Sequence, residues 1–208
     1  MKKINGTTVL IRGTEWFARL AVLNLIWLLF SLPLFTIIPA TYTLFAVLQR
    51  LLDGEDLDKS IYFLFKNKFI SSFKESYRIG FSFIVMGIWL TINLLFFFIA
   101  TSTSPWFHIF KTATIFLAIL YTFLFFYSFA LSIFIEERPL HMIGTAFIIM
   151  LSQPGYTGMV GLSIIFSTII FDFFPALLFF FPMSGISLLF LKATKRGYHK
   201  LILKIQTK

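Results

Sequence analysis

The side chains that could do chemistry in this chain are few, and they lie in apolar sequence. Asp172 is the acid within the long apolar runs, while Asn24, Trp27 and Asn93 place polar groups in other runs. A charged residue inside a bilayer costs about 2.5–3.5 kcal/mol on insertion scales, so it is a candidate site. We expect Asp172 to be a loop acid at an outer corner, with a proton or ligand site within a span as the alternative.

The asparagines suggest packing rather than chemistry. An asparagine in hydrocarbon usually hydrogen-bonds to a neighbouring helix. Asn24 lies one turn from Trp27 on the first apolar run, and Asn93 lies on a later one. We therefore expect both asparagines to join helices, with substrate contact as the alternative.

The chain lacks the residue sets that usually catalyse reactions or bind metals. It has no cysteine, and its three histidines, His108, His141 and His199, are far apart and form no HExxH or HxH pattern. P-loop, GxGxxG and GxSxG motifs are absent as well. We therefore predict no catalytic residue, no cofactor and no metal site, and a protein that is not an enzyme.

The composition is that of a membrane protein. Of the 208 residues, 58% are hydrophobic and 13% are charged, whereas soluble domains have about 45–50% and about 25%. The apolar residues form long runs, which predicts an all-α, polytopic membrane helix bundle. The net charge of +9 fits cations gathered on a cytoplasmic face, so we expect no nucleic-acid partner.

Prolines divide the two longest apolar runs. Pro33 and Pro39 interrupt the first run, and Pro175 and Pro182 interrupt the last. Because proline ends or restarts helices, we predict two short hairpins there. The predicted membrane segments cover about 17–33, 38–52, 79–100, 112–135, 158–173 and 175–191.

The length of the short legs leaves their depth open. Fifteen residues, as in 38–52, rise about 22 Å, whereas the hydrocarbon core is about 30 Å thick. A full crossing and a deep re-entrant hairpin are both compatible with this length.

The distribution of cations predicts the orientation. If both proline-broken runs double back, Lys111 alone among the 18 Lys and Arg residues lies outside. If each run crosses once, the basic region 50–78 lies outside, against the positive-inside tendency. We therefore predict a multi-pass protein of the cell membrane with cytoplasmic N- and C-termini.

Residues 57–78 are too charged to cross a bilayer and read as an amphipathic helix. Aromatic residues recur every four positions on one side, and cations occupy the other. Such a helix lies in the membrane interface and binds partners. Its aromatic face can also pack on the protein's own helices, and the two interpretations are compatible. A second, shorter apolar segment, 140–151, is a further candidate for an interfacial helix. The candidate interfacial or partner-binding residues are Phe65, Lys66, Phe69, Phe73, Lys74 and Arg78.

An internal repeat is suggested at an offset of 81 positions. Ser71 and Gly80 align with Ser152 and Gly161. We predict a single membrane domain, 1–208, in which 38–100 and 119–181 are parallel repeats about an axis along the membrane normal.

The N-terminal region resembles a known family. Trp16, Asn24, Trp27, the Pro39-Ala40-Thr41 triplet and the ending "VLQRLLDGED" are similar to the signature of the YesL-like integral membrane proteins of Gram-positive bacteria. The closing "FFPMSGISLLFL" fits as well. The family is a domain of unknown function whose members are often encoded beside carbohydrate ABC importers and polysaccharide-degrading enzymes.

This resemblance implies a helper role in sugar uptake. Our first hypothesis is a non-enzymatic accessory protein of a carbohydrate ABC importer, with permease subunits and the lipid bilayer as partners. The alternatives are a small passive facilitator or channel, and a membrane enzyme acting on lipid-linked or sugar substrates. A homo-oligomer is compatible with each of them.

Overall fold

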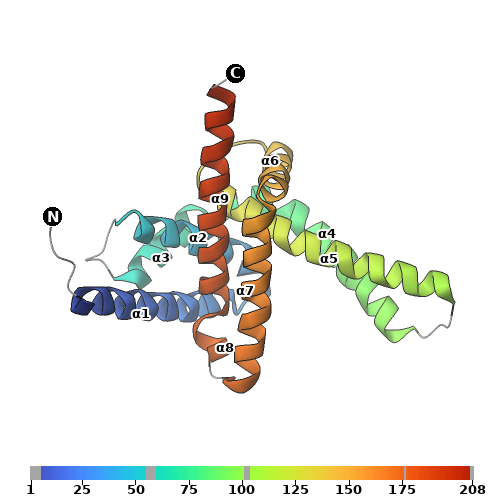
Figure 1. The fold of residues 1–208 in the computed structure, drawn as a ribbon, viewed down its shortest axis with the longest axis horizontal. Coiled ribbons are helices and arrows are strands. Elements are labelled where there is room, and N and C mark those ends of the chain that lie inside the picture. Colours follow the sequence, from blue (N-terminus) through green and yellow to red (C-terminus); the bar gives the residue numbers. More distant parts are fainter. Residues whose placement is uncertain (1–5, 55–59, 101–103, 176, 207–208) are drawn as a thin grey trace.

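The computed structural model describes residues 6–54, 60–100, 104–175 and 177–206. These residues form helices and no strand, which confirms the predicted all-α class (Figure 1). The helices are α1 (Gly6–Ser31), the 3₁₀ turn η1 (Leu34–Thr36), α2 (Ile37–Leu52), α3 (Ile61–Ser71), α4 (Phe73–Ile99), α5 (Pro105–Leu131), α6 (Pro139–Ser152), α7 (Pro154–Phe173), α8 (Leu177–Phe180) and α9 (Pro182–Gln206).

Prolines set the starts of many of these helices. Pro105, Pro139, Pro154 and Pro182 are each the first residue of their helix, where the missing N–H has no intrahelical partner to lose. This explains why α5 starts at Pro105, before the predicted 112, and why α7 starts at Pro154, before the predicted 158.

The first proline-broken run doubles back as predicted. After α1, the Thr36 amide donates to the Pro33 carbonyl at 2.7 Å, and the Thr36 hydroxyl contacts the Pro33 and Phe30 carbonyls at 2.6 Å each. The indole Nε1 of Trp27 then donates to the Thr41 hydroxyl at 3.2 Å. α1 and α2 are therefore joined side by side across a tight corner.

The second corner differs in detail from the prediction. α7 and α9 pack together and are joined through the single turn α8. The predicted last segment, 175–191, does not end at Leu191, because α9 continues through the basic sequence to Gln206. Lys192, Lys195 and Arg196 are exposed there.

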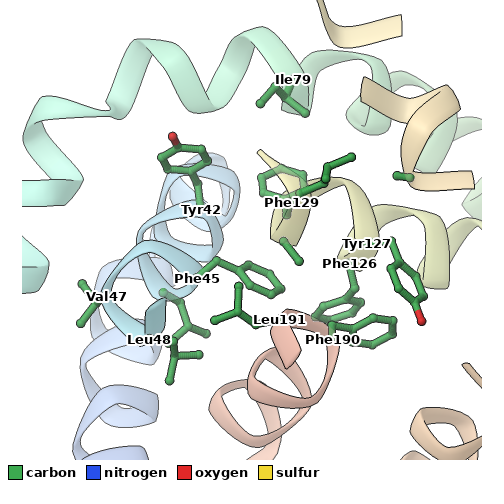
Figure 2. Close-up of a cluster of buried hydrophobic side chains, with 14 of the residues drawn as sticks. Tyr42, Phe45, Val47, Leu48, Ile79, Phe126, Tyr127, Phe129, Phe190 and Leu191 are labelled. Carbon is green, nitrogen blue, oxygen red and sulfur yellow. The ribbon is translucent and has the colours of Figure 1, made fainter. Parts of the chain in front are cut away.

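The core forms around α2, which packs on α1, α3, α4, α5 and α9. Figure 2 shows Phe45 of α2, Phe126 of α5 and Phe190 of α9 meeting at this centre. The Phe126 and Phe190 rings stack with centroids 4.8 Å apart. The short helix predicted at 38–52 is thus the most enclosed element, buried over most of its length.

The predicted amphipathic helix 57–78 is wrong as a single element. α3 ends at Ser71 and α4 begins at Phe73, so residues 73–78 start the long helix. The Ser72 hydroxyl donates to the Lys68 carbonyl at 2.6 Å, and serine side chains that bond the backbone in this way compete with helix continuation. Residues 57–59 lie outside the described part.

α4 and α5 form a long hairpin that leads away from the core (Figure 1). Near its tip, the Phe97 and Phe107 rings lie 5.3 Å apart, and near its base Phe83 packs on Tyr121 at 5.9 Å. The buried residues of α4 lie almost entirely in its first eleven positions. Most of the hairpin surface is therefore uncovered by the rest of the described chain.

Four helical stretches of the described chain are long and apolar enough to cross a membrane: Gly13–Ser31, Leu34–Leu52, Phe73–Ile99 and Pro105–Leu131. α6 and α7 together qualify as a fifth, although they are bent by 90°. The chain is thus a helical protein with several candidate spans. Six membrane segments were predicted. The difference lies at the C-terminal end, where the cations of α9 lower the mean hydropathy of that helix.

The helix boundaries are compatible with the predicted repeat. α3 and α6 end at Ser71 and Ser152, and α4 and α7 begin at Phe73 and Pro154. Both pairs are separated by the predicted 81 positions. The repeat stays a prediction that these equal offsets support.

Candidate functional site: two polar hollows beside α2

The predicted intramembrane polar residues have different environments. Asn24 is 1% exposed; its Nδ2 donates to the Phe179 carbonyl, and its Oδ1 accepts from the Met183 and Ser184 amides, at 2.9–3.0 Å. It therefore joins α1 to the α8–α9 corner, as expected. Asn93 instead donates to the Trp89 carbonyl of its own helix.

Asp172 lies in the last turn of α7 and is exposed. This places it beside the α7–α8 corner, where the sequence suggested a loop acid. Trp27 is the partner of Thr41 described above.

The aromatic stripe of the predicted interfacial helix packs inward. Phe65 is fully buried, and the rings of Phe65 and Phe69 lie 5.2 and 4.9 Å from that of Phe30. Phe73 continues the stack from Phe69 at 5.6 Å. The aromatic face thus packs on the protein's own helices, which is compatible with an interfacial position of the helix, and that position stays a prediction. The cations opposite it, Lys66, Lys74 and Arg78, are exposed.

A hollow rich in hydrogen-bond donors lies between the end of α2 and α3. It has a volume of about 530 Å³, and its polar lining comes from Arg50, Lys68, Ser60, Asn67 and Ser71, with Phe63 and Leu64 as apolar walls. Among the described residues that line it, none is acidic. We call it the cationic hollow, after Arg50 and Lys68.

A second hollow, of about 320 Å³, lies on the other side of Arg50 and Lys68. It is enclosed by α2, α3, the first turn of α4 and the turn after α5. We call it the acceptor hollow, because its lining adds the oxygen-bearing side chains of Gln49, Glu75 and Glu136.

Tyr42 forms the inner wall of the acceptor hollow. Glu75 is close enough to interact electrostatically with its hydroxyl, and the Lys68 Nζ lies over its ring, 5.6 Å from the centroid. Such a cation–aromatic contact holds the lysine at this boundary.

An ion pair closes the end of α2 against α9. The Lys195 Nζ donates to Asp53 Oδ1 at 2.9 Å, and the Gln49 Nε2 donates to Asp53 Oδ2. The hydrogen bond from Lys195, more than that from Gln49, holds the pKa of Asp53 below its ordinary value. Both charged side chains are substantially exposed, at 41% and 52%.

This pair predicts a weak pH dependence of stability. Because the pKa of Asp53 is lowered in the folded state, its contribution is present above the unfolded pKa of about 3.9 and fades as pH falls through the folded value. For an exposed pair we expect Asp53→Asn to lower the free energy of unfolding by at most about 1 kcal/mol at pH 7. Thermal unfolding in detergent should show this difference shrinking as the pH is lowered below about 4. An equal loss at pH 3 and pH 7 would contradict it.

The base of the α4–α5 hairpin bears a third, apolar hollow of about 830 Å³. Ile38 of α2, Gly87 and Thr91 of α4, and Tyr121 and Phe125 of α5 are among its lining residues. We call it the hairpin groove.

The sequence did not point to either polar hollow. Tyr42 and Gln49 lie seven positions apart on one face of α2, but Glu75 and Glu136 follow far along the chain. A usable signal was the polar face of α2 itself, because polar side chains in an otherwise apolar helix need partners.

Among the described residues, no group of three or more His, Asp or Glu could hold a metal ion.

These features define a polytopic helical membrane protein with a polar site beside its central helix. Residues 20–94 match the model of a family described as "Protein of unknown function, DUF624". This match agrees with the YesL-like resemblance over residues 20–94. The matched region includes Asn24, α2, α3 and most of α4.

A curated relative extends the similarity over most of the chain. It is "Uncharacterized protein YteU" of Bacillus subtilis (strain 168), 26% identical over 182 residues, which cover 86% of this chain and 80% of the relative. No solved structure matches.

Proposed function

We propose that this protein is a non-enzymatic accessory subunit of a membrane assembly, with the permease of a carbohydrate ABC importer as its partner. The observation that carries the proposal is the α4–α5 hairpin. Each of its helices has 27 residues, about 40 Å at 1.5 Å per residue. Large side chains such as Phe81, Trp89 and Phe96 are exposed along it.

Such a hairpin suits helix–helix docking within a bilayer. Helices associate there through close packing and interhelical hydrogen bonds rather than through the hydrophobic effect. The hairpin groove allows both close packing and interhelical hydrogen bonds, because it combines an apolar wall with small or hydroxyl-bearing residues such as Gly87 and Thr91. The choice of an importer as partner rests on the family resemblance alone.

The alternative of a passive channel has less support. α2, α5 and α9 pack on one another at the centre of the described chain. The space between them contains Phe45 and the stacked rings of Phe126 and Phe190 (Figure 2).

Co-purification in mild detergent tests the proposal. We expect the wild-type protein to retain permease subunits in a fixed ratio, and Thr91→Trp, which fills the hairpin groove, to lose them. Ile169→Trp is the matched control, because Ile169 is exposed on α7 and outside the groove. A wild-type protein that purifies alone or as a homo-oligomer would contradict the accessory role, and partner retention by Thr91→Trp would exclude the groove.

We also propose the cell membrane as its location, with both termini in the cytoplasm. Because the chain has no cysteine, Ser104→Cys and Lys200→Cys each introduce a unique label site. In intact cells, a membrane-impermeant maleimide is expected to label Ser104→Cys at the hairpin tip and to label Lys200→Cys only after lysis. The reverse pattern would invert the orientation.

A further inference from the structure

The exposed side of α3 carries an apolar ridge beside the cationic hollow. Phe63 and Ile70 lie two turns apart on this side and are 61% and 64% exposed, and Lys66 is exposed between them. An apolar face flanked by cations is typical of a helix that lies in the membrane interface. Phe63 also lines the cationic hollow, so a molecule in the hollow lies directly beside this ridge.

The polar lining of the hollow consists of side chains that donate hydrogen bonds. Four of them contribute from α2, from α3 and from the residue before α3: Arg50, Ser60, Asn67 and Lys68. Ser60 makes no side-chain cap hydrogen bond at the start of α3. A phosphate group has oxygen acceptors on every side, and arginine and lysine are the side chains that commonly bind it.

Lys68 is a cation without a carboxylate partner. It is partly buried, its Nζ lies over the Tyr42 ring, and it forms no ion pair with any residue that the structure describes. Glu75 and Glu136 line the neighbouring acceptor hollow and are not among the lining residues of the cationic hollow. A partly buried charge is costly unless it is paired, so Lys68 favours an anion from outside the chain.

The second pair of helices shows that the fold does not need these donors for packing. α6 packs on α5 as α3 packs on α2, at the offset of 81 positions that relates the two predicted repeats. The counterparts of three donors are apolar: Leu131 for Arg50, Ile148 for Asn67 and Ile149 for Lys68. A helix in this place therefore packs equally well without them.

We infer that the cationic hollow binds the headgroup of an anionic phospholipid, with its phosphate beside Asn67 and Lys68 and its acyl chains along Phe63 and Ile70. The volume of about 530 Å³ is more than ten times the roughly 30 Å³ of one water molecule, which accommodates a phosphate with its glycerol. Basic pockets beside membrane helices suit such headgroups. The apolar ridge favours a lipid over a soluble phosphate compound, which has no chain to place there.

A comparison of lipids in nanodiscs tests the inference. We expect the full-length protein to unfold at a higher temperature in phosphatidylcholine discs that contain phosphatidylglycerol than in discs of phosphatidylcholine alone. Both lipids carry a phosphate, but only phosphatidylcholine also carries a compensating ammonium. Native mass spectrometry should then show phosphatidylglycerol retained on the protein in preference to phosphatidylcholine. The absence of a preference in both measurements would overturn the inference.

Matched variants on α3 separate a site from general attraction to a positive surface. Lys68→Met and Asn67→Leu are each expected to weaken the retention of phosphatidylglycerol about tenfold, the size typical of losing one charged hydrogen bond. Lys66→Met is the matched control, because it removes the same charge from the same helix but Lys66 does not line the hollow. The unfolding midpoint in phosphatidylcholine alone reports whether each variant is folded. Equal weakening by Lys66→Met and Lys68→Met, with no effect of Asn67→Leu, would exclude the site.

Glycerol phosphate decides between a lipid and a soluble ligand. It carries the phosphate and the glycerol but no acyl chain, so we expect it to leave the unfolding midpoint in phosphatidylcholine discs unchanged. If it stabilises the protein as strongly as phosphatidylglycerol does, and Lys68→Met removes the effect, the assignment to a lipid is wrong. None of these measurements involves the proposed importer partner, so this site and the proposed function can fail separately.

Discussion

Gly80→Ala is expected to destabilise the protein strongly, although alanine is the better helix former. A Cβ built on Gly80 would lie 2.3 Å from Ile38 Cγ2 and 3.4 Å from Ile38 Cβ. The Cγ2 atom is close to the backbone of α2 and cannot rotate away freely in a β-branched side chain. The substitution must therefore separate α2 from α4 at the core.

Overpacking of this kind costs about 1–3 kcal/mol, which exceeds the 0.5–1 kcal/mol that alanine gains over glycine in a helix. Gly144→Ala is the matched control, because Gly144 lies within α6 and a Cβ at this position would meet no other atom within 4 Å. We expect the thermal unfolding midpoint in detergent to fall for Gly80→Ala and to stay or rise for Gly144→Ala.

A double-mutant cycle identifies the cause. Ile38→Ala removes the clashing methyl group, so the loss for Gly80→Ala combined with Ile38→Ala is expected to be smaller than the sum of the single losses. Additive losses would mean that contact with Ile38 is not the reason that position 80 needs glycine.

The class of fold was predictable because it depends on features that are local in the sequence. Long apolar runs indicate membrane helices, and the prolines at 33, 39 and 182 mark corners that the structure contains. Both proline-interrupted apolar runs double back because the helices on either side of each break are close in sequence and pack on each other. Such corners need no knowledge of distant contacts.

Two predicted helix boundaries were wrong. One depends on a side chain that bonds the backbone, and at the other the basic sequence suggested that the helix had ended. The break at Ser72 depends on one hydroxyl bonding the Lys68 carbonyl, while the aromatic spacing continues through it without interruption. The basic sequence after Leu191 looked like a tail, but α9 continues because its opposite face, with Ala193, Thr194 and Gly197, is buried. Helical packing overrides the charge of the exposed face.

The polar hollows were not predictable for a topological reason. Their lining comes from α2, α3, α4 and the turn after α5, elements that only the fold brings together. Asn24 was identified correctly as a residue that joins helices, since an amide in an apolar run needs a partner. Its partner, more than 150 positions away, could not be named from spacing.

Asn24→Leu is expected to produce a large loss, because this side chain completes the start of another helix. α9 begins at Pro182, so the Met183 and Ser184 amides belong to its first turn and have no acceptor within their own helix. The Asn24 Oδ1 accepts from both at 3.0 Å. It therefore acts as an N-cap supplied from α1.

Leucine at position 24 would leave these two amides and the Phe179 carbonyl without their partner in a buried site. Each such group costs about 1–3 kcal/mol in water-soluble proteins and about 0.6 kcal/mol on average in a membrane protein. We expect the free energy of unfolding to fall by roughly 2–4 kcal/mol, toward the upper end if no water reaches the corner.

Asn93→Leu is the matched control for this substitution. Asn93 lies on a candidate span as well, but it donates to the Trp89 carbonyl within its own helix, so its replacement is expected to change stability by less than about 0.5 kcal/mol. Hydrogen exchange gives a local readout, since the Met183 and Ser184 amides should lose protection in Asn24→Leu and keep it in Asn93→Leu. Equal losses of stability in the two variants, with protection at α9 unchanged, would show that α9 does not depend on a cap from α1.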